Sequence, residues 1–208
     1  MAISTKLKSA TTYKDTAFGI IPRSKVVVLE QEGVKKAQEY IIKLSQQKEA
    51  ITPDTICDVH RVGFGFIFPD WSGKFRTIDV IVGEYEPPYF SRIPELVKNL
   101  CDDLSERLSH LTSPEQEEQF LVEIISLLAW FQHRFVWLHP FRDYNGRVAR
   151  LLTNLLLLNL GLPIAPIKAE TRSDRDKYVE AMKKADENDY SKLEELISNA
   201  LTQSLEKV

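Results

Sequence analysis

The segment from residue 139 to residue 150 combines the residue types that are needed to handle a metal-bound polyphosphate; it reads HPFRDYNGRVAR. Asn145-Gly146 is a turn signal, because glycine tolerates backbone angles that other residues avoid. The following run, Arg147 to Leu160, predicts a helix. The first N–H groups of a helix lack partners within it and carry the positive end of its dipole, so this start predicts an anion site.

The charged side chains of the segment suit the same chemistry. Arg147 and Arg150 are three residues apart and share one helical face, from which guanidinium groups can grip phosphate oxygens. Asp143 offers the hard oxygen ligand that Mg²⁺ prefers. His139 could accept a proton from an attacking hydroxyl. A capped helix start with charged decoration is the alternative, but it does not require these residues in fixed order.

The pattern resembles the signature of the Fic family, HPFx(D/E)GNGRxxR, and departs from it at Tyr144, where the family usually has glycine. The resemblance implies transfer of AMP from Mg-ATP to a Ser, Thr or Tyr hydroxyl of a target protein. It also implies a mainly helical fold with a small β-hairpin flap. His139 would be the general base and Asp143 would hold Mg²⁺. The remaining matched positions would bind the β- and γ-phosphates: Asn145, Gly146, Arg147 and Arg150.

The flanking sequence extends the resemblance over residues 52–206. Residues 120–136 resemble the family's central helix, His60-Arg61 the segment before its flap, and Asp189 onward its closing helix. Residues 71–82 resemble the flap, and the alternation from Phe75 to Val82 predicts a strand. From the alternation alone, a hairpin that merely covers the core is the favoured interpretation. The resemblance instead implies that the flap binds the target through Lys74, Phe75, Arg76, Thr77, Ile78 and Asp79.

Apolar spacing and helix-start residues predict an all-α domain apart from this hairpin. The expected helix starts are Thr52-Pro53-Asp54, Pro94, Ser113-Pro114-Glu115, Ser173 and Tyr190, and Gly161 should end the helix after the motif. Val26 to Leu29 suggest a short strand, and residues 1–17 are expected to be loosely ordered. We therefore predict an N-terminal extension over residues 1–51, containing one helix, and a Fic domain over residues 52–208.

Composition narrows the remaining function classes. The net charge of −3 argues against a general nucleic-acid or membrane-surface binder. Cys57 and Cys101 are expected to be small buried residues in a reducing compartment. No signal-peptide-like stretch begins the chain, which favours a cytoplasmic protein, although export by a specialised secretion system would leave no such mark.

Three questions stay open at this level. Tyr144 would be strained if its backbone is left-handed, and its ring either points to solvent or crowds the β-phosphate. The second outcome would favour a Fic-fold kinase or other phosphoryl-type transferase, and a degenerate binding module is a further alternative. Tyr178 could wall a purine pocket, but an aromatic residue on such a helix more often belongs to the core.

Regulation and assembly are also open. Many family members carry an inhibitory helix of pattern (S/T)xxxE(G/N), and three segments match it imperfectly, with Glu49, Glu195 and Glu206 at the glutamate position. We predict no intrinsic inhibitory motif, or inhibition by a separate antitoxin-like partner. A homodimer is an open possibility.

Overall fold

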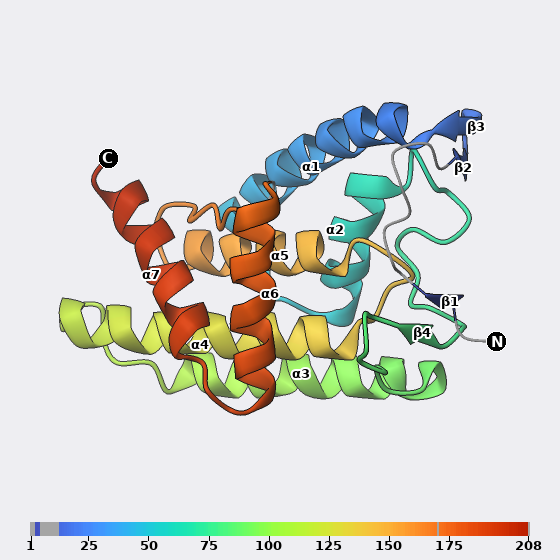
Figure 1. The fold of residues 1–208 in the computed structure, drawn as a ribbon. Coiled ribbons are helices and arrows are strands. Elements are labelled where there is room, and N and C mark those ends of the chain that lie inside the picture. The colour runs from blue at the N-terminus through green and yellow to red at the C-terminus, as the bar shows by residue number, and fades with distance from the viewer. Residues whose placement is uncertain (1–2, 5–12, 170, 208) are drawn as a thin grey trace.

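The computed structural model describes residues 3–4, 13–169 and 171–207. The fold is mainly helical, as predicted, and Figure 1 shows its elements along the chain. The helices are α1 (Arg23–Gln46), α2 (Pro53–Phe64), α3 (Ile93–Ser109), α4 (Glu117–Leu138), α5 (Asn145–Asn159), α6 (Arg172–Asp186) and α7 (Ser191–Leu205), with a 3-10 turn, η1, at Phe90–Arg92. The strands are β1 (Ile3–Ser4), β2 (Tyr13–Thr16), β3 (Gly19–Pro22) and β4 (Val80–Ile81).

The centre of the fold is α4, which packs against α3, α5 and α7. Figure 1 shows α3, α4 and α5 running alongside one another, with α6 and α7 lying across them and α1 along the far side of α5. The loop between α4 and α5 therefore emerges at one end of this layer, beside β4. That loop is the segment that carries the motif.

Most predicted helix boundaries are confirmed. Thr52 caps α2 by accepting a hydrogen bond from the Thr55 N–H, and Tyr190 caps α7. Gly161 follows α5 with a φ of 78°, as expected of a residue that ends a helix. Two predicted helix starts are inaccurate. The start predicted at Ser113-Pro114-Glu115 precedes α4, which begins at Glu117. The start predicted at Ser173 lies inside α6, which begins at Arg172 with Thr171 as its cap.

The strand predicted at Val26–Leu29 is wrong, because these residues belong to α1. The buried face of α1 carries Val26, Glu30, Gly33, Ala37 and Ile41 at helical spacing. A Cβ atom at Gly33 would lie 1.9 Å from the Gly63 carbonyl oxygen, so only glycine lets α1 approach α2 this closely. Within residues 1–17, Tyr13–Thr16 pair antiparallel with Gly19–Pro22, and residues 1–2 and 5–12 lie outside the described part.

The flap contains less strand than the alternation predicted. Only Val80–Ile81 of the expected Phe75–Val82 strand is regular, and it pairs in parallel with Ile3–Ser4. A tight turn follows, closed by two backbone hydrogen bonds between Val82 and Tyr85. Arg76 belongs to the alternating run, but its guanidinium turns inward and binds the carbonyls of His139 and Ile78. These bonds hold the segment in a conformation other than a regular strand.

Among the described helices, α4 is long and apolar enough by composition alone to cross a membrane. Half of its most apolar window is buried inside the fold, as is usual for a central helix.

Candidate active site

The motif loop is closed by its own side chains. Phe141 is fully buried and anchors the loop in the core. Its backbone N–H donates to Asn145 Oδ1 at 2.8 Å, and Asn145 Nδ2 donates to the Phe141 carbonyl at 2.9 Å. The Asn145 side chain is therefore used to shape the loop, and only its backbone is left to contact a phosphate.

His139 ends α4 in the left-handed region, with φ 48° and ψ 56°. Its Nδ1 lies 3.4 Å from the Val136 carbonyl oxygen, which assigns the proton to Nδ1 and leaves Nε2 as the acceptor nitrogen. Burial lowers the pKa of His139 to about 4, and the charge of Arg76 acts in the same direction. The imidazole is therefore neutral near pH 7, which is the form that a general base requires.

We expect an NMR titration of the imidazole Hε1 signals to show His139 changing charge near pH 4, well below the ordinary value of 6.5. The sign follows from burial, which disfavours the protonated form, so the basic form persists to lower pH. Loss of the signal in His139→Asn assigns it. A midpoint above pH 6 would contradict this environment.

The start of α5, where an anion cradle is predicted, has backbone N–H groups without intrahelical partners. The N–H groups of Arg147 and Val148 both donate to the Tyr144 carbonyl, so the amides of Asn145 and Gly146 precede the first intrahelical bonds. A Cβ atom added at Gly146 would meet only Arg150 Nη1, at 3.7 Å, which leaves open space above the backbone. Arg147 Nη1 is buried without a hydrogen-bond partner, and a phosphate oxygen would satisfy it.

Asp143 lies in the same loop, and its Oδ1 accepts the N–H of Tyr144 at 2.7 Å. No cluster of three or more His, Cys, Asp or Glu side chains that could hold a metal occurs among the described residues. A metal at this loop would thus depend on one carboxylate together with ligand oxygens. This donor set fits Mg²⁺, which is commonly held by one or two carboxylates and the phosphates of a substrate.

One buried carboxylate on α1 occupies part of this cradle. Glu30 is 1% exposed, and its Oε2 lies 2.9 Å from Arg147 Nη2. It also accepts hydrogen bonds from Arg23 and, at 2.7 Å, from the Tyr144 hydroxyl. Burial by itself raises the pKa of Glu30, but the bond from Arg23, the charge of Arg147 and the Tyr144 hydroxyl outweigh it, so the pKa lies below the usual value. Glu30 is therefore ionised and forms an ion pair with Arg147.

Glu30 was not among the site residues predicted from the sequence. The three glutamates that it considered, Glu49, Glu195 and Glu206, are all exposed. The available signal was a single acid within an apolar stripe of α1, at the spacing of Val26 and Gly33. The strand predicted over residues 26–29 hides this helical spacing, because in a strand Glu30 would not share a face with Gly33.

Comparison with known proteins agrees with this geometry. Residues 50–157 match the model of the Fic/DOC family. The chain belongs to the Fic/DOC family. It is 31% identical over 174 residues to protein adenylyltransferase Fic of Drosophila willistoni, covering 84% of this chain and 32% of that protein. It is 30% identical over 148 residues to protein adenylyltransferase Fic of Nematostella vectensis, covering 71% and 32%. The chain thus spans about a third of the length of these relatives.

Solved structures show the same fold. Fic-1 (residues 134–508) from C. elegans superimposes with a TM-score of 0.67 at 26% identity, covering 84% of this chain and 48% of that one. BepC from Bartonella tribocorum, solved with bound AMPPNP, has a TM-score of 0.70 at 18% identity and covers 93% and 94% of the two chains.

Tyr144 is the position at which this Fic chain departs from the family pattern. The backbone is left-handed, with a φ of 66°. The residue is 9% exposed, so its ring does not point to solvent; it stacks on Phe64 with centroids 4.0 Å apart and on Trp71 at 6.0 Å. Tyr144 therefore belongs to an aromatic cluster. The Arg147 guanidinium lies 5.2 Å from the ring centroid, and the effect of the ring on a bound β-phosphate stays a prediction.

We expect Tyr144→Phe to lower the free energy of unfolding by about 1–2 kcal/mol, because a buried hydroxyl bonded to a carboxylate is lost while the aromatic stack remains. Chemical denaturation would measure the change. Tyr89→Phe is the matched control, since Tyr89 is 73% exposed. Equal stability of Tyr144→Phe and wild type would contradict the assigned hydrogen bond.

The other predicted site residues divide into two groups. Tyr178 lies in the core, and the Arg150 guanidinium lies 5.5 Å from its ring centroid. Tyr178 therefore contacts the second arginine of the motif, and its contact with a purine stays a prediction.

In the flap, Lys74 and Thr77 are exposed and Ile78 is half-buried. Phe75 packs 5.8 Å from Phe141, and Asp79 accepts the N–H of Phe90. Arg76 is buried, and the expectation that its side chain docks a target is corrected below.

His60 connects the flap to the motif loop. Its ring stacks on Phe141 with centroids 3.9 Å apart. Its Nδ1 accepts the Gly73 N–H at 2.8 Å, and its Nε2 lies 3.2 Å from the Asp143 carbonyl oxygen. These two bonds require a proton on Nε2. The sequence analysis had placed His60 only by resemblance.

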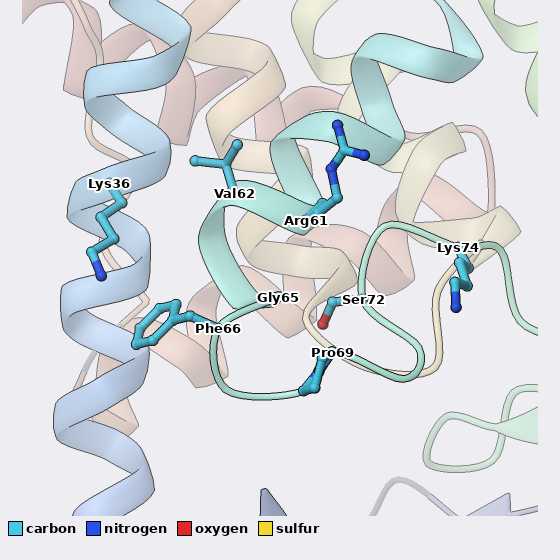
Figure 2. Close-up of a pocket in the computed structure, with 8 residues that line it drawn as sticks. All are labelled: Lys36, Arg61, Val62, Gly65, Phe66, Pro69, Ser72 and Lys74. Carbon is cyan, nitrogen blue, oxygen red and sulfur yellow. The ribbon is translucent and has the colours of Figure 1, made fainter. Parts of the chain in front are cut away.

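A cavity of about 460 Å³ lies beside this connection, between α1, the end of α2 and the loop that follows. Figure 2 shows Lys36, Arg61 and Lys74 around it and Ser72 at its inner wall. None of its lining residues belongs to the motif. A phosphate bound by Arg147 would therefore lie in the open space above Gly146, outside this cavity.

Proposed function

We propose that this chain transfers AMP from ATP to a hydroxyl side chain of a target protein. The observation that carries the proposal is the pairing, within one loop, of a neutral histidine with a free Nε2 and a buried Arg147 Nη1 that lacks a partner. His139 Nε2 can accept the proton that the target hydroxyl must lose, and Arg147 Nη1 can bind an oxygen of the leaving phosphates. The relatives that share the family bear the name protein adenylyltransferase.

The reaction then proceeds as an in-line displacement. The target hydroxyl oxygen forms a bond to the α-phosphorus, and its proton passes to His139 Nε2. The bond between the α-phosphorus and the bridging oxygen breaks, and pyrophosphate leaves with the electron pair. The amides of Asn145 and Gly146 and the guanidinium groups of Arg147 and Arg150 hold the leaving phosphates, which stabilises the developing charge. Mg²⁺ held by Asp143 would offset negative charge on the phosphates.

The alternatives are less favoured. The kinase interpretation depended on Tyr144 crowding the β-phosphate, and the ring instead packs against Phe64. A degenerate binding module would not need a histidine, an aspartate and two arginines around one open backbone. A separate inhibitory partner and a homodimer stay predictions, as does a cytoplasmic location.

The deciding experiment compares ATP labelled at the α-phosphate with ATP labelled at the γ-phosphate, each with Mg²⁺ and a cell lysate. Adenylylation predicts protein-bound α-label and a mass increase equal to AMP. Label from the γ-phosphate alone would overturn the proposal in favour of a kinase. Absence of both labels, in a chain that binds ATP and lacks the Glu30 carboxylate, would exclude both transfers.

A further inference from the structure

Arg76 is a buried cation whose partners are almost all backbone carbonyls. It is 4% exposed. Its Nε donates to the His139 carbonyl at 2.9 Å, its Nη1 donates to the Ile78 carbonyl at 2.9 Å, and its Nη2 donates to the Pro88 carbonyl. Its backbone N–H donates to the Pro140 carbonyl at 2.9 Å. One residue of the flap thus binds two successive carbonyls of the motif loop.

Burying a guanidinium is unfavourable unless its N–H groups are satisfied. The nearest carboxylate, Asp79, is 3.5 Å away and 41% exposed, so it offsets only part of that penalty. The planar fork of arginine fits three carbonyls that approach from three segments: the end of α4, the flap itself and the turn before η1. Such an arrangement fixes the segments relative to one another, and with 4% of Arg76 exposed it leaves little of the guanidinium accessible to a target protein.

The carbonyl bound by Nε belongs to His139, whose backbone is left-handed with a φ of 48°. The left-handed conformation of His139 costs about 1–2 kcal/mol for a residue with a side chain. The bond from Arg76 Nε to the His139 carbonyl holds the peptide plane after His139. The plane before it is held by the His139 N–H, which donates to the Phe135 carbonyl at 3.2 Å. These two planes set the direction of the His139 Cα–Cβ bond, from which the imidazole extends.

We infer that Arg76 is a positioning residue, which holds the backbone of His139 so that the imidazole faces the reacting hydroxyl. This inference rests on the proposed function, because it assigns His139 the base. Arg76 acts through His139 and contacts neither nucleotide nor target.

Arg76 has an electrostatic effect in addition to its geometric one. Burial is the main reason that the pKa of His139 is low, the Val136 carbonyl raises it, and the charge of Arg76 lowers it. Removing the charge should therefore raise the pKa of His139. A residue that merely filled space would leave that pKa unchanged.

The test compares Arg76→Gln, Arg76→Lys and the control Arg92→Gln, which removes an exposed guanidinium from η1. For Arg76→Gln we expect kcat for AMP transfer to fall at least about tenfold, since small misplacements of a catalytic group have large effects. The KM for ATP should change by less than about threefold, because the phosphate-binding groups are untouched. The His139 titration midpoint should move upward. Arg76→Lys should keep the low midpoint and recover only part of kcat, and Arg92→Gln should match wild type.

Wild-type kcat in Arg76→Gln, or an unmoved His139 midpoint, would overturn the inference. If Arg76→Gln does not fold, the same two measurements on Arg76→Lys decide, with unchanged kcat as the contrary result. The NMR readout does not depend on turnover. Failure of the proposed function would appear as absence of transfer even in a chain that lacks the Glu30 carboxylate, with the low His139 midpoint still present. Failure of this inference would leave transfer intact in Arg76→Gln and the midpoint unmoved.

Discussion

Replacing Glu30 by alanine is expected to strengthen binding of Mg-ATP by roughly 10–100-fold and to raise AMP transfer with it. The carboxylate lies 2.9 Å from Arg147 Nη2, where a phosphate oxygen would bind, so nucleotide and Glu30 compete for one guanidinium. A hydrogen bond between charged groups contributes about 1.5–3 kcal/mol, which sets this range. Isothermal titration calorimetry measures binding, and α-label incorporation measures transfer.

The same change should lower stability, because it leaves Arg23, Arg147 and the Tyr144 hydroxyl without their shared acceptor. Breaking a buried pair from one side costs roughly 3–5 kcal/mol. Glu30→Gln keeps an acceptor for Tyr144 and serves as the second variant if alanine unfolds the chain. Glu32→Ala is the matched control on the same helix, since Glu32 is exposed and pairs only with Lys36. Unchanged ATP affinity in a folded Glu30 variant would show that the carboxylate does not block the site.

Replacing His139 is expected to lower AMP transfer by roughly 10²–10⁴-fold, the usual contribution of a positioned general base, while ATP binding stays within about threefold of the parent. Asparagine is the better replacement, because it tolerates the left-handed backbone at this position. The measurement is best made in the Glu30→Ala chain, where the basal rate is highest. A double variant that has the ATP affinity of the Glu30→Ala parent but no transfer separates chemistry from binding.

The control for this change is His110→Ala, which removes an exposed histidine paired with Glu106 at the end of α3. It should transfer AMP at the parent rate. His139→Asn that kept more than about a tenth of the parent rate would be inconsistent with a general base worth at least two orders of magnitude. Attention would then move to the other buried ring near the loop, His60, which hydrogen-bonds the Asp143 carbonyl.

The contact between Glu30 and Arg147 depends on the packing of α1. Glu30 reaches Arg147 because α1 lies close to α2, at the Gly33–Gly63 crossing, and packs on α5. Glu30 is thus more than a hundred positions from the arginine that it contacts. Tyr144 also donates to the same carboxylate from the motif side. A residue that departs from the family pattern therefore contributes to holding Glu30 against the motif loop.

The sequence by itself determined the helical class, most helix boundaries and the motif loop. Each depends on local information: apolar spacing on one helix face, a Thr52 cap, a Gly161 stop and a run of chemically distinct residues between His139 and Arg150. Such patterns encode short-range hydrogen bonding and amphipathicity, which neighbouring residues largely fix.

Only the tertiary structure decided which groups reach the loop from elsewhere. Glu30 on α1, Arg76 in the flap and His60 on α2 all contact the motif across long sequence separations. No local pattern separates a flap arginine that binds a target from one that binds the His139 carbonyl. The position of the Tyr144 ring depends on Phe64 and Trp71, which lie far from it in the sequence. These contacts arise from the packing of distant segments, where a single buried charge or ring is positioned by neighbours that its own sequence context does not contain.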